Sequence, residues 1–187
     1  MSRTWLYADP HFGHEAICSF TRDDGTKLRP FATAAEMDKE LIYRYITTVK
    51  REDKVYFLGD VAMKPAALDV LGALPGDKVL VKGNHDQAKI SRYLQYFRDV
   101  RAYWQLGRCL LSHIPVHPQS VGRWVANIHG HLHYREVMTR SDQPGRQLLE
   151  VPDSRYLCVS VEHTDYAPIL LEDALERIKQ RQSGSHQ

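Results

Sequence analysis

Aspartate, asparagine and histidine residues recur in this chain directly after short apolar runs. They occur in five places: Asp9–Pro10–His11, Gly59–Asp60, Gly83–Asn84–His85–Asp86, Ser112–His113 and Gly130–His131–Leu132–His133. Each place alone has an ordinary explanation as a turn, a helix cap or a structural histidine. All five together favour a single site, because the strands of an open α/β sheet end at the edge that lines the ligand crevice.

The donor types of these residues indicate metal chemistry. Imidazole, carboxylate and amide groups without thiolate favour Mn²⁺, Fe²⁺ or Zn²⁺ over a structural zinc, which prefers cysteine. His131 and His133 alternate, so an extended segment would place both rings on one side. The donors suffice for two ions, and a carboxylate-bridged pair ~3.5–4 Å apart brackets an in-line displacement at phosphorus. We expect the glycines before Asp60, Asn84 and His131 to form sharp turns that aim these side chains at the ions.

The segments between these residues predict the elements that must position them. Apolar runs predict strands at residues 5–8, 55–58, 78–82, 109–112, 125–128 and 156–161. Helical spacing and a proline start predict helices at residues 34–49, 65–74, 86–97 and 172–182. Strands that alternate with helices are typical of an α/β layered fold. Two polar, turn-rich segments, 18–30 and 138–155, interrupt this pattern, and the second predicts a hairpin with a turn at Gln143–Gly145.

Length and composition limit the class of protein. A chain of 187 residues suits one domain, which we expect at residues 1–182, with a flexible tail at 183–187. With 25 Lys and Arg against 23 Asp and Glu, the net charge of +2 gives no strong nucleic-acid-binding signature. No stretch approaches the ~20 apolar residues of a membrane span, and the first residues lack the apolar region of a signal peptide. Three cysteines without CxxC spacing indicate reduced thiols and a cytoplasmic protein, while the oligomeric state stays open.

The ordered motifs from Asp9 to His133 resemble the signature of the calcineurin-like metallophosphoesterases. The runs His11–His14, Val159–Glu162 and Tyr166–Ile169 are similar to those of a small single-domain branch found in bacteria and phages, which extends the likeness over most of the chain. The resemblance implies a four-layer α/β sandwich of two mixed β-sheets packed together, with helices on the outside. It also implies a phosphoester hydrolase with a dinuclear metal centre and a metal-bridging hydroxide.

The resemblance assigns a role to each motif residue. One ion would be held by Asp9, His11, Asp60 and His133. The other would be held by Asp60, Asn84, His113 and His131, so that Asp60 bridges the pair. His85 would protonate the leaving oxygen or stabilise its charge, with Asp86 orienting the ring, and a histidine beside an aspartate suits that role. We expect Mn²⁺, while Fe, Zn and Ni fit the same ligands.

Further residues are candidates for substrate contacts. His14, Arg29 and His117 lie in or near the motifs, although each also reads as a helix start or a solvated loop. Trp124 and Tyr134 could stack a nucleobase, with core packing the stronger expectation for Trp124. We expect a phosphodiesterase for a small phosphoester or nucleotide-type substrate, because the chain is too short for a cap domain and no motif arginine would neutralise a monoester dianion. The alternatives are a phosphomonoesterase or protein phosphatase, and a non-catalytic, metal-bound scaffold.

Overall fold

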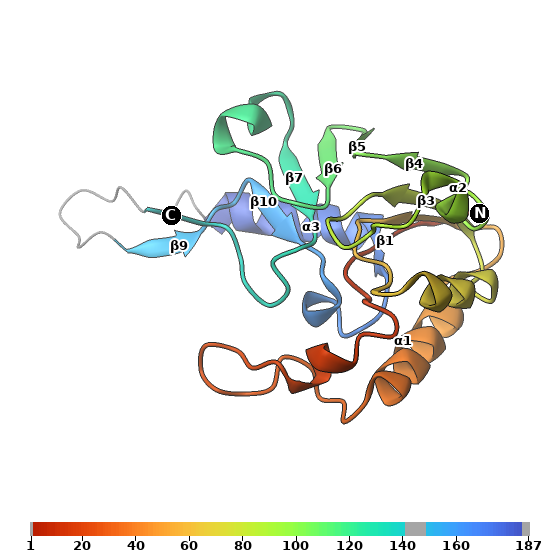
Figure 1. Cartoon of the computed structure of the whole chain (residues 1–187). Coiled ribbons are helices and arrows are strands. Elements are labelled where there is room, and N and C mark those ends of the chain that lie inside the picture. The colour runs from red at the N-terminus through yellow and green to blue at the C-terminus, as the bar shows by residue number, and fades with distance from the viewer. Residues whose placement is uncertain (1, 141–148, 185–187) are drawn as a thin grey trace.

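The computed structural model describes residues 2–140 and 149–184, so the expected turn at Gln143–Gly145 lies outside it. Two mixed sheets form the protein, with strand orders β11-β1-β2-β3-β4 and β10-β7-β6-β5 (Figure 1). The first sheet consists of β1 (Thr4–Tyr7), β2 (Lys54–Phe57), β3 (Asp77–Val81), β4 (Asp99–Arg101) and β11 (Ile169–Leu170). The second consists of β5 (Tyr103–Leu106), β6 (Cys109–Ser112), β7 (Ala126–His129) and β10 (Tyr156–Cys158). The predicted α/β class with two mixed sheets is confirmed.

Parallel pairing brings the ends of the strands together. β1, β2, β3 and β4 run parallel, as do β6, β7 and β10, and only the edge strands β11 and β5 are antiparallel to their neighbours. A parallel bridge between Ala8 and Ser160 links the segment after β1 to the segment after β10. The carboxyl ends of parallel strands meet at one edge of a sheet. The residues that follow β1, β2, β3, β6 and β7 are therefore neighbours in space.

The alternation of side chains along the strands builds two hydrophobic clusters. Between the sheets, residues such as Leu6 and Val79 pack with Leu111 and Ile128. On its other face the first sheet packs against α1 (Ala34–Thr48), whose Tyr45 ring lies edge-on to Tyr7 at 5.5 Å between centroids. Thr33 begins α1 by accepting a hydrogen bond from the Glu36 backbone. α1 is thus an outer layer on the first sheet.

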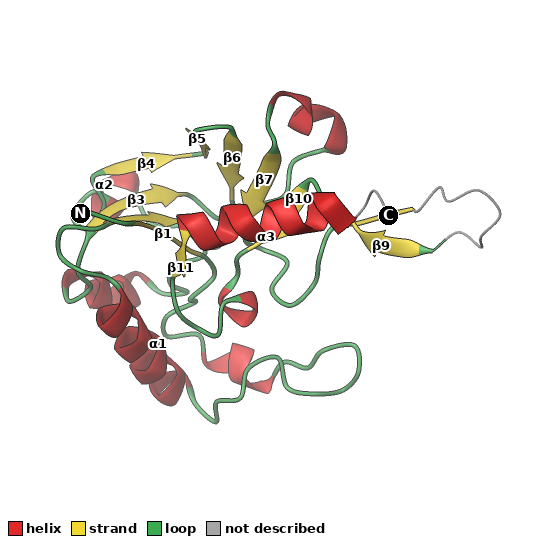
Figure 2. Ribbon diagram, turned by 180° about the vertical axis from the view of Figure 1, so that it is seen from behind, coloured by secondary structure: helices red, strands yellow, loops and turns green. Residues whose placement is uncertain are grey.

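The C-terminal helix closes one side of the molecule. α3 (Leu171–Gly184) contacts β1 and β11 of the first sheet and β10 of the second, and it runs across the strands in Figure 2. Ala174 and Ile178 of α3 are buried within the cluster between the sheets. α3 therefore covers the edge of the sandwich near β10 and β11. The outer face of the second sheet is flanked by the loop after β6 and a short 3-10 helix, η3 (Pro118–Arg123).

Several elements differ from the sequence prediction. Of the helix expected at 86–97, only α2 (Ile90–Tyr93) is α-helical, because the Asp86 carboxylate binds backbone N–H groups and holds the chain before α2 in a loop. The helix expected at 65–74 is the 3-10 helix η2 (Pro65–Gly72). The segment 138–155 contains the antiparallel pair β8 (Met138–Arg140) and β9 (Glu150–Pro152). The remaining short elements are the 3-10 helices η1 (Glu15–Ser19) and η4 (Val161–His163).

Cys18, Cys109 and Cys158 are buried and free. Within residues 2–140 and 149–184, no helix combines the length and the apolar character needed to cross a membrane.

Candidate metal centre

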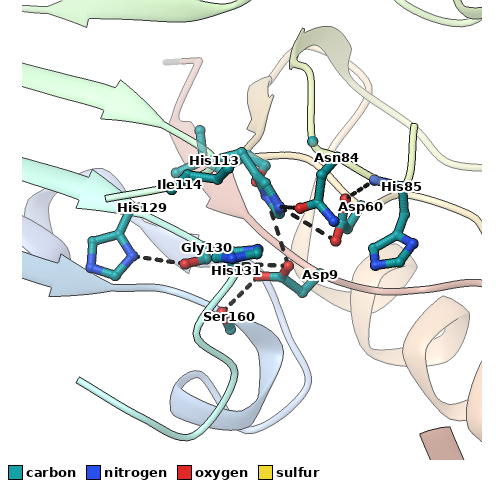
Figure 3. A network of polar contacts seen from close by, with 12 residues as sticks. Asp9, Asp60, Asn84, His85, His113, Ile114, His129, Gly130, His131 and Ser160 are labelled. Carbon is teal, nitrogen blue, oxygen red and sulfur yellow. Dashed lines mark hydrogen bonds and ion pairs between the residues drawn. The ribbon is translucent and has the colours of Figure 1, made fainter. Parts of the chain in front are cut away.

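The structure brings all seven expected metal ligands to one edge of the two sheets. Figure 3 shows five of them side by side: Asp9, Asp60, Asn84, His113 and His131. Six of them form two groups whose ligand atoms lie within 4.8 Å of one another: Asp9, His11 and His133 in the first group, and Asp60, His113 and His131 in the second. The seventh, Asn84, places Oδ1 2.8 Å from Nε2 of His113. This division into two groups is the one that the motif resemblance implies.

Asp60 lies between the two groups. Its Oδ2 atom is 3.5 Å from Nε2 of His11 in the first group and 3.3 Å from Nε2 of His113 in the second. Burial raises the pKa of this carboxyl, but the hydrogen bond and charge of His113, together with His11, outweigh it and lower the pKa to about 2. Asp60 is thus an ionised carboxylate within reach of ligands from both groups.

The backbone at the centre is strained at five of the expected ligands. The residues with positive φ are Asp9 (57°), His11 (53°), Asp60 (53°), His131 (71°) and His133 (53°). Such angles are uncommon outside glycine and cost on the order of 1–3 kcal/mol each. Strain of this kind persists only where the surrounding structure imposes it, and it clusters at functional sites. The concentration here indicates that the fold is built to aim these side chains at one point.

The glycines of the motifs serve two different purposes. Gly59, with φ of +86°, forms the sharp turn that the sequence predicts before Asp60. Gly83 and Gly130 also begin turns, because the Gly83 carbonyl oxygen accepts from the Asp86 N–H at 3.4 Å and that of Gly130 from the Leu132 N–H at 2.8 Å, but neither glycine has positive φ. These two glycines instead leave room for carboxylates, since a Cβ on Gly130 would lie 2.5 Å from Oδ2 of Asp9 and one on Gly83 would overlap Asp60.

The donors of the centre fit a cation. The His11 ring is buried, yet neither of its nitrogens has a hydrogen-bond partner within the described part of the chain. Burial lowers the pKa of His11 well below its ordinary value, so the neutral ring offers a lone pair. His113 Nδ1 lies 2.8 Å from the Leu58 carbonyl oxygen and carries the proton there. Burial lowers the pKa of His113, but the hydrogen bond and charge of Asp60 and the charge of Asp9 outweigh it and raise the pKa to about 9, so without a metal ion Nε2 also carries a proton. That proton faces the Asn84 and Asp60 oxygens, and a cation bound there would take its place.

Glu162 is a candidate site residue to which the sequence gave no role. Its side chain is buried, and its Oε1 atom lies 3.0 Å from Nδ1 of His133. Burial raises the pKa of Glu162, but Arg29 and His133 outweigh it and lower the pKa to about 2. The ionised carboxylate therefore fixes the tautomer of His133 and leaves Nε2 for a metal ion, as carboxylate partners of metal-binding histidines do.

Arg29 has a different place from the one expected. The sequence suggests a contact with substrate, but the side chain is fully buried beneath the centre. Its guanidinium donates to the carbonyl oxygens of Asp9 at 2.6 Å and Pro10 at 2.9 Å, and to Glu162 at 2.8 Å. Buried carbonyl groups need donors and a buried carboxylate needs a cation, so Arg29 holds the strained loop after β1 instead of reaching solvent.

Asp86 also differs from expectation. Its carboxylate accepts hydrogen bonds from the backbone N–H groups of Asp60, Val61 and Gly83 at 2.8–3.0 Å, and among the described residues no hydrogen bond joins it to the His85 ring that it was expected to orient. Burial raises the pKa of Asp86. Asp86 therefore ties the loop after β2 to the loop after β3, which carries Asn84 and His85.

His85 lies on the open side of the centre. Its side chain is exposed, and its ring centroid is 5.6 Å from that of His11. Its backbone N–H donates to Oδ1 of Asp60 at 2.9 Å (Figure 3). A group bound at the centre would thus meet the His85 ring from the solvent side.

Ser160 is the second residue that the sequence analysis missed. Its hydroxyl donates to Oδ2 of Asp9 at 2.6 Å, and the His131 backbone N–H donates to both Asp9 oxygens at 2.9–3.1 Å (Figure 3). Burial raises the pKa of Asp9 to about 6, against the charges of His113 and His133. Ser160 and Glu162 lie two and four residues after the end of β10. The signal that could have found them is therefore the one that marks the motifs, a polar residue at the end of a buried strand.

The other two substrate candidates differ in their distance from the centre. The half-buried His14 ring lies 5.3 Å from the His11 ring, between centroids. His117 is exposed and accepts a hydrogen bond from the Gln119 backbone at 3.3 Å, which caps the start of η3. His14 therefore adjoins the centre, and His117 has a local structural contact.

The fold and the centre define an α/β protein with two candidate metal-binding groups at the strand ends. No family model matches the chain. It is 29% identical over 178 residues to the uncharacterized protein MJ1445 of Methanocaldococcus jannaschii, covering 92% of this chain and 89% of that protein.

Among solved structures, the protein of unknown function AQ665 from Aquifex aeolicus matches with a TM-score of 0.64 and 25% identity, over 94% of this chain and 99% of that chain. The Pseudomonas putida nuclease MPE gives a TM-score of 0.39 at 23% identity over 79% of this chain and 67% of its own. Vacuolar protein sorting 29 from Cryptosporidium parvum gives a TM-score of 0.41 at 16% identity, over 84% of this chain and 72% of its own. The Aquifex protein therefore shares the fold over nearly the whole of both chains.

Proposed function

We propose that this protein is a phosphoester hydrolase of the calcineurin-like metallophosphoesterase type, with two divalent ions at the candidate metal centre. The observation that carries the proposal is the position of Asp60, whose carboxylate lies 3.5 Å from a histidine of one ligand group and 3.3 Å from a histidine of the other. A carboxylate that bridges two ions is what two-metal hydrolysis requires. The ordered motifs of the sequence support the same reaction.

The first ion would be held by Asp9, His11, His133 and the shared Asp60. The second would be held by His113, His131, Asn84 and Asp60. When bound, two such ions neutralise charge on a phosphate and lower the pKa of a water molecule. We expect Mn²⁺, because nitrogen and oxygen donors without thiolate suit it, as they suit Fe, Zn and Ni.

The chain's own residues contribute in two ways. His85, exposed beside the centre, donates a proton to the leaving oxygen, a contribution on the order of 10²–10⁴-fold in rate. Glu162 and Ser160 hold His133 and Asp9 in the orientation that metal binding needs. Asp86 keeps Asp60 and the His85 loop together through backbone hydrogen bonds.

We expect this chemistry to take place in the cytoplasm, since all three buried cysteines are free.

Two clefts beside the centre favour phosphodiesters as substrates. One of about 900 Å³ adjoins Asn84 and His113, and another of about 600 Å³ adjoins His131 and His133. A diester carries a substituent on each side of the phosphorus, and each cleft can take one. Arg29 is buried and occupied, so it is not available for the additional charge of a monoester.

A comparison of two chromogenic substrates tests the proposal. After removal of metals with a chelator and addition of Mn²⁺, we expect bis(nitrophenyl) phosphate to be hydrolysed with a higher kcat/KM than nitrophenyl phosphate. A clear monoester preference would indicate a phosphomonoesterase or protein phosphatase. No hydrolysis of either ester by protein with two bound ions, whether Mn, Fe, Zn or Ni, would refute the enzyme and leave a metal-bound scaffold.

A further inference from the structure

A cleft of about 900 Å³ lies on the outer face of the second sheet. Its floor includes Tyr103 of β5 and Leu110 of β6, and its far wall is the loop that leads through η3 to Trp124. Side chains on this face of the sheet alternate with those that face the first sheet, such as Leu111. The cleft of about 900 Å³ occupies the position where the expected outer helical layer would lie.

The cleft is continuous with the candidate metal centre. Asn84 and His113 line the cleft and also belong to the second ligand group. A substituent on a phosphate held at the centre can therefore extend directly along the sheet. Figure 3 shows the Asn84 and His113 side chains facing each other, with Ile114 next to His113.

Exposed apolar groups gather in this cleft. Tyr103 is 62% exposed and Ile114 is 52% exposed, and both contribute to the lining together with the half-buried Trp124. Exposed apolar side chains scattered over a surface are ordinary, but here several share one cleft next to a reactive centre. Aromatic rings of this kind stack on the flat faces of nucleobases.

The charges in the cleft favour an anion. Lys82 and Arg123 line it, and the lining contains no carboxylate. Neither cation takes part in an ion pair with another described residue. The amides of Gln105 and Gln119 offer both donors and acceptors for the edge of a base. Rings, free cations and amide groups together match a nucleotide, which has a flat base, polar edges and a phosphate.

The other clefts beside the centre fit this ligand less well. The cleft near His131 and His133 contains Arg135, but its guanidinium is paired with Asp23. The cleft beside His85 measures only about 230 Å³ and has Lys64 at its border. The large cleft is therefore the one suited to recognise a base.

We propose that this cleft binds the nucleotidyl substituent of the substrate, with the base between Tyr103 and Trp124 and a flanking phosphate near Lys82 and Arg123. The inference rests on the proposed function for its position in catalysis, and it names the substrate class as nucleotide phosphodiesters. Free dinucleotides and the ends of oligonucleotides share this chemistry.

The first experiment measures binding without turnover. Thymidine 5′-monophosphate and ribose 5-phosphate are titrated into metal-free protein by calorimetry, for the parent and for Tyr103→Ala, Trp124→Ala and Trp124→Phe. We expect the two alanine variants to weaken nucleotide binding about 10-fold, a typical contribution of one stacked base, and Trp124→Phe to retain most of the affinity. Tyr43→Ala, which removes a tyrosine that is 60% exposed on α1, is the matched control and should bind like the parent.

The second experiment measures selectivity in turnover. With Mn²⁺, the ratio of kcat/KM for thymidine 5′-nitrophenyl phosphate over methyl nitrophenyl phosphate should fall about 10-fold in Tyr103→Ala. Lys82→Gln and Arg123→Gln should raise KM more for a trinucleotide than for a dinucleotide if oligonucleotide ends are the substrate, and equally for both if free dinucleotides are. Lys39→Gln, an exposed lysine on α1, is the matched control.

The outcomes separate the two proposals. If both diesters are hydrolysed and no cleft variant selectively loses kcat/KM for the base-bearing diester, the proposal of base binding in the cleft is overturned and the proposed hydrolase activity stands. Loss of nucleotide binding in the alanine variants of a protein that hydrolyses neither diester would support the cleft and overturn the hydrolase. Equal effects of Tyr103→Ala on thymidine monophosphate and ribose phosphate would also overturn base recognition.

Discussion

Glu162→Gln tests the buried network that supports the first ligand group. The substitution keeps the size of the side chain and removes the negative charge that Arg29 and His133 share at 2.8 Å and 3.0 Å. Arg29 and Glu162 are both fully buried, so the guanidinium would keep its charge without a counterion. His133 would also lose the ionised acceptor that fixes its tautomer.

The magnitude follows from this burial. Removing one partner of a buried ion pair costs about 3–5 kcal/mol, and the glutamine oxygen can still accept one hydrogen bond, so we expect about 3 kcal/mol. In a domain of this size that loss lowers Tm by roughly 6–12 °C. Loss of a carboxylate partner of a metal-binding histidine weakens the metal by about 10–100-fold. We expect this weakening at the first ion, because Glu162 contacts His133 and no residue of the second group in the described structure.

Two assays measure the effects separately. Thermal unfolding of metal-free protein reports the stability, and titration with Mn²⁺ by calorimetry reports the affinity of each ion. Asp77→Asn is the control, since it breaks an ion pair with Arg98 in which both side chains are about half exposed, and it should change stability by only about 0–1 kcal/mol. Equal weakening of both ions, or an unchanged Tm, would refute the reasoning.

Four further predictions follow from the structure and the proposed reaction. Asp60→Asn should lower the content of both ions, measured by elemental analysis, and nearly abolish turnover, because the Asp60 carboxylate lies between the two ligand groups. Full metal content with near-normal activity would contradict the bridging role. His85→Ala should reduce the rate on the order of 10²–10⁴-fold at unchanged metal content, with a smaller loss for activated leaving groups that need no proton, and an equal loss on all leaving groups would argue against general acid catalysis. Thiol titration of the denatured, unreduced protein should find three free thiols, and a value of one would reveal a disulfide. Burial raises the pKa of Asp53, but hydrogen bonds from the backbones of Arg3 and Lys50 and from the Trp5 indole outweigh it and lower the pKa below its ordinary 3.8. The stability that Asp53 contributes is therefore present above that pH and is lost as the pH falls through the lowered pKa. The difference in Tm between the parent and Asp53→Asn should shrink in acid, and a constant difference would contradict this linkage.

The sequence by itself determined which residues meet at the candidate metal centre. A short apolar run precedes each of five expected ligands, namely Asp9, Asp60, Asn84, His113 and His131. Such runs form buried strands, and the carboxyl ends of parallel strands share one edge of the sheet. Local sequence also specified α1, where Thr33 and the helical spacing of apolar residues act within a few turns of the chain. These signals are readable because their physical causes lie between residues close together in the sequence.

The tertiary structure decided how those residues are held. A loop arginine looks the same in a sequence whether water or protein surrounds it, so the pairing of Arg29 with Glu162, 133 positions away, could not be read from its neighbours. The loop at Asp86 replaces an expected helix because its carboxylate binds the backbone of Asp60, 26 positions away. The cleft at Tyr103 likewise depends on how far the loop through η3 stands from the sheet. Long-range hydrogen bonds and buried charges reach their low energy only when the whole fold has excluded water from them, and for that reason the local sequence carries no sign of them.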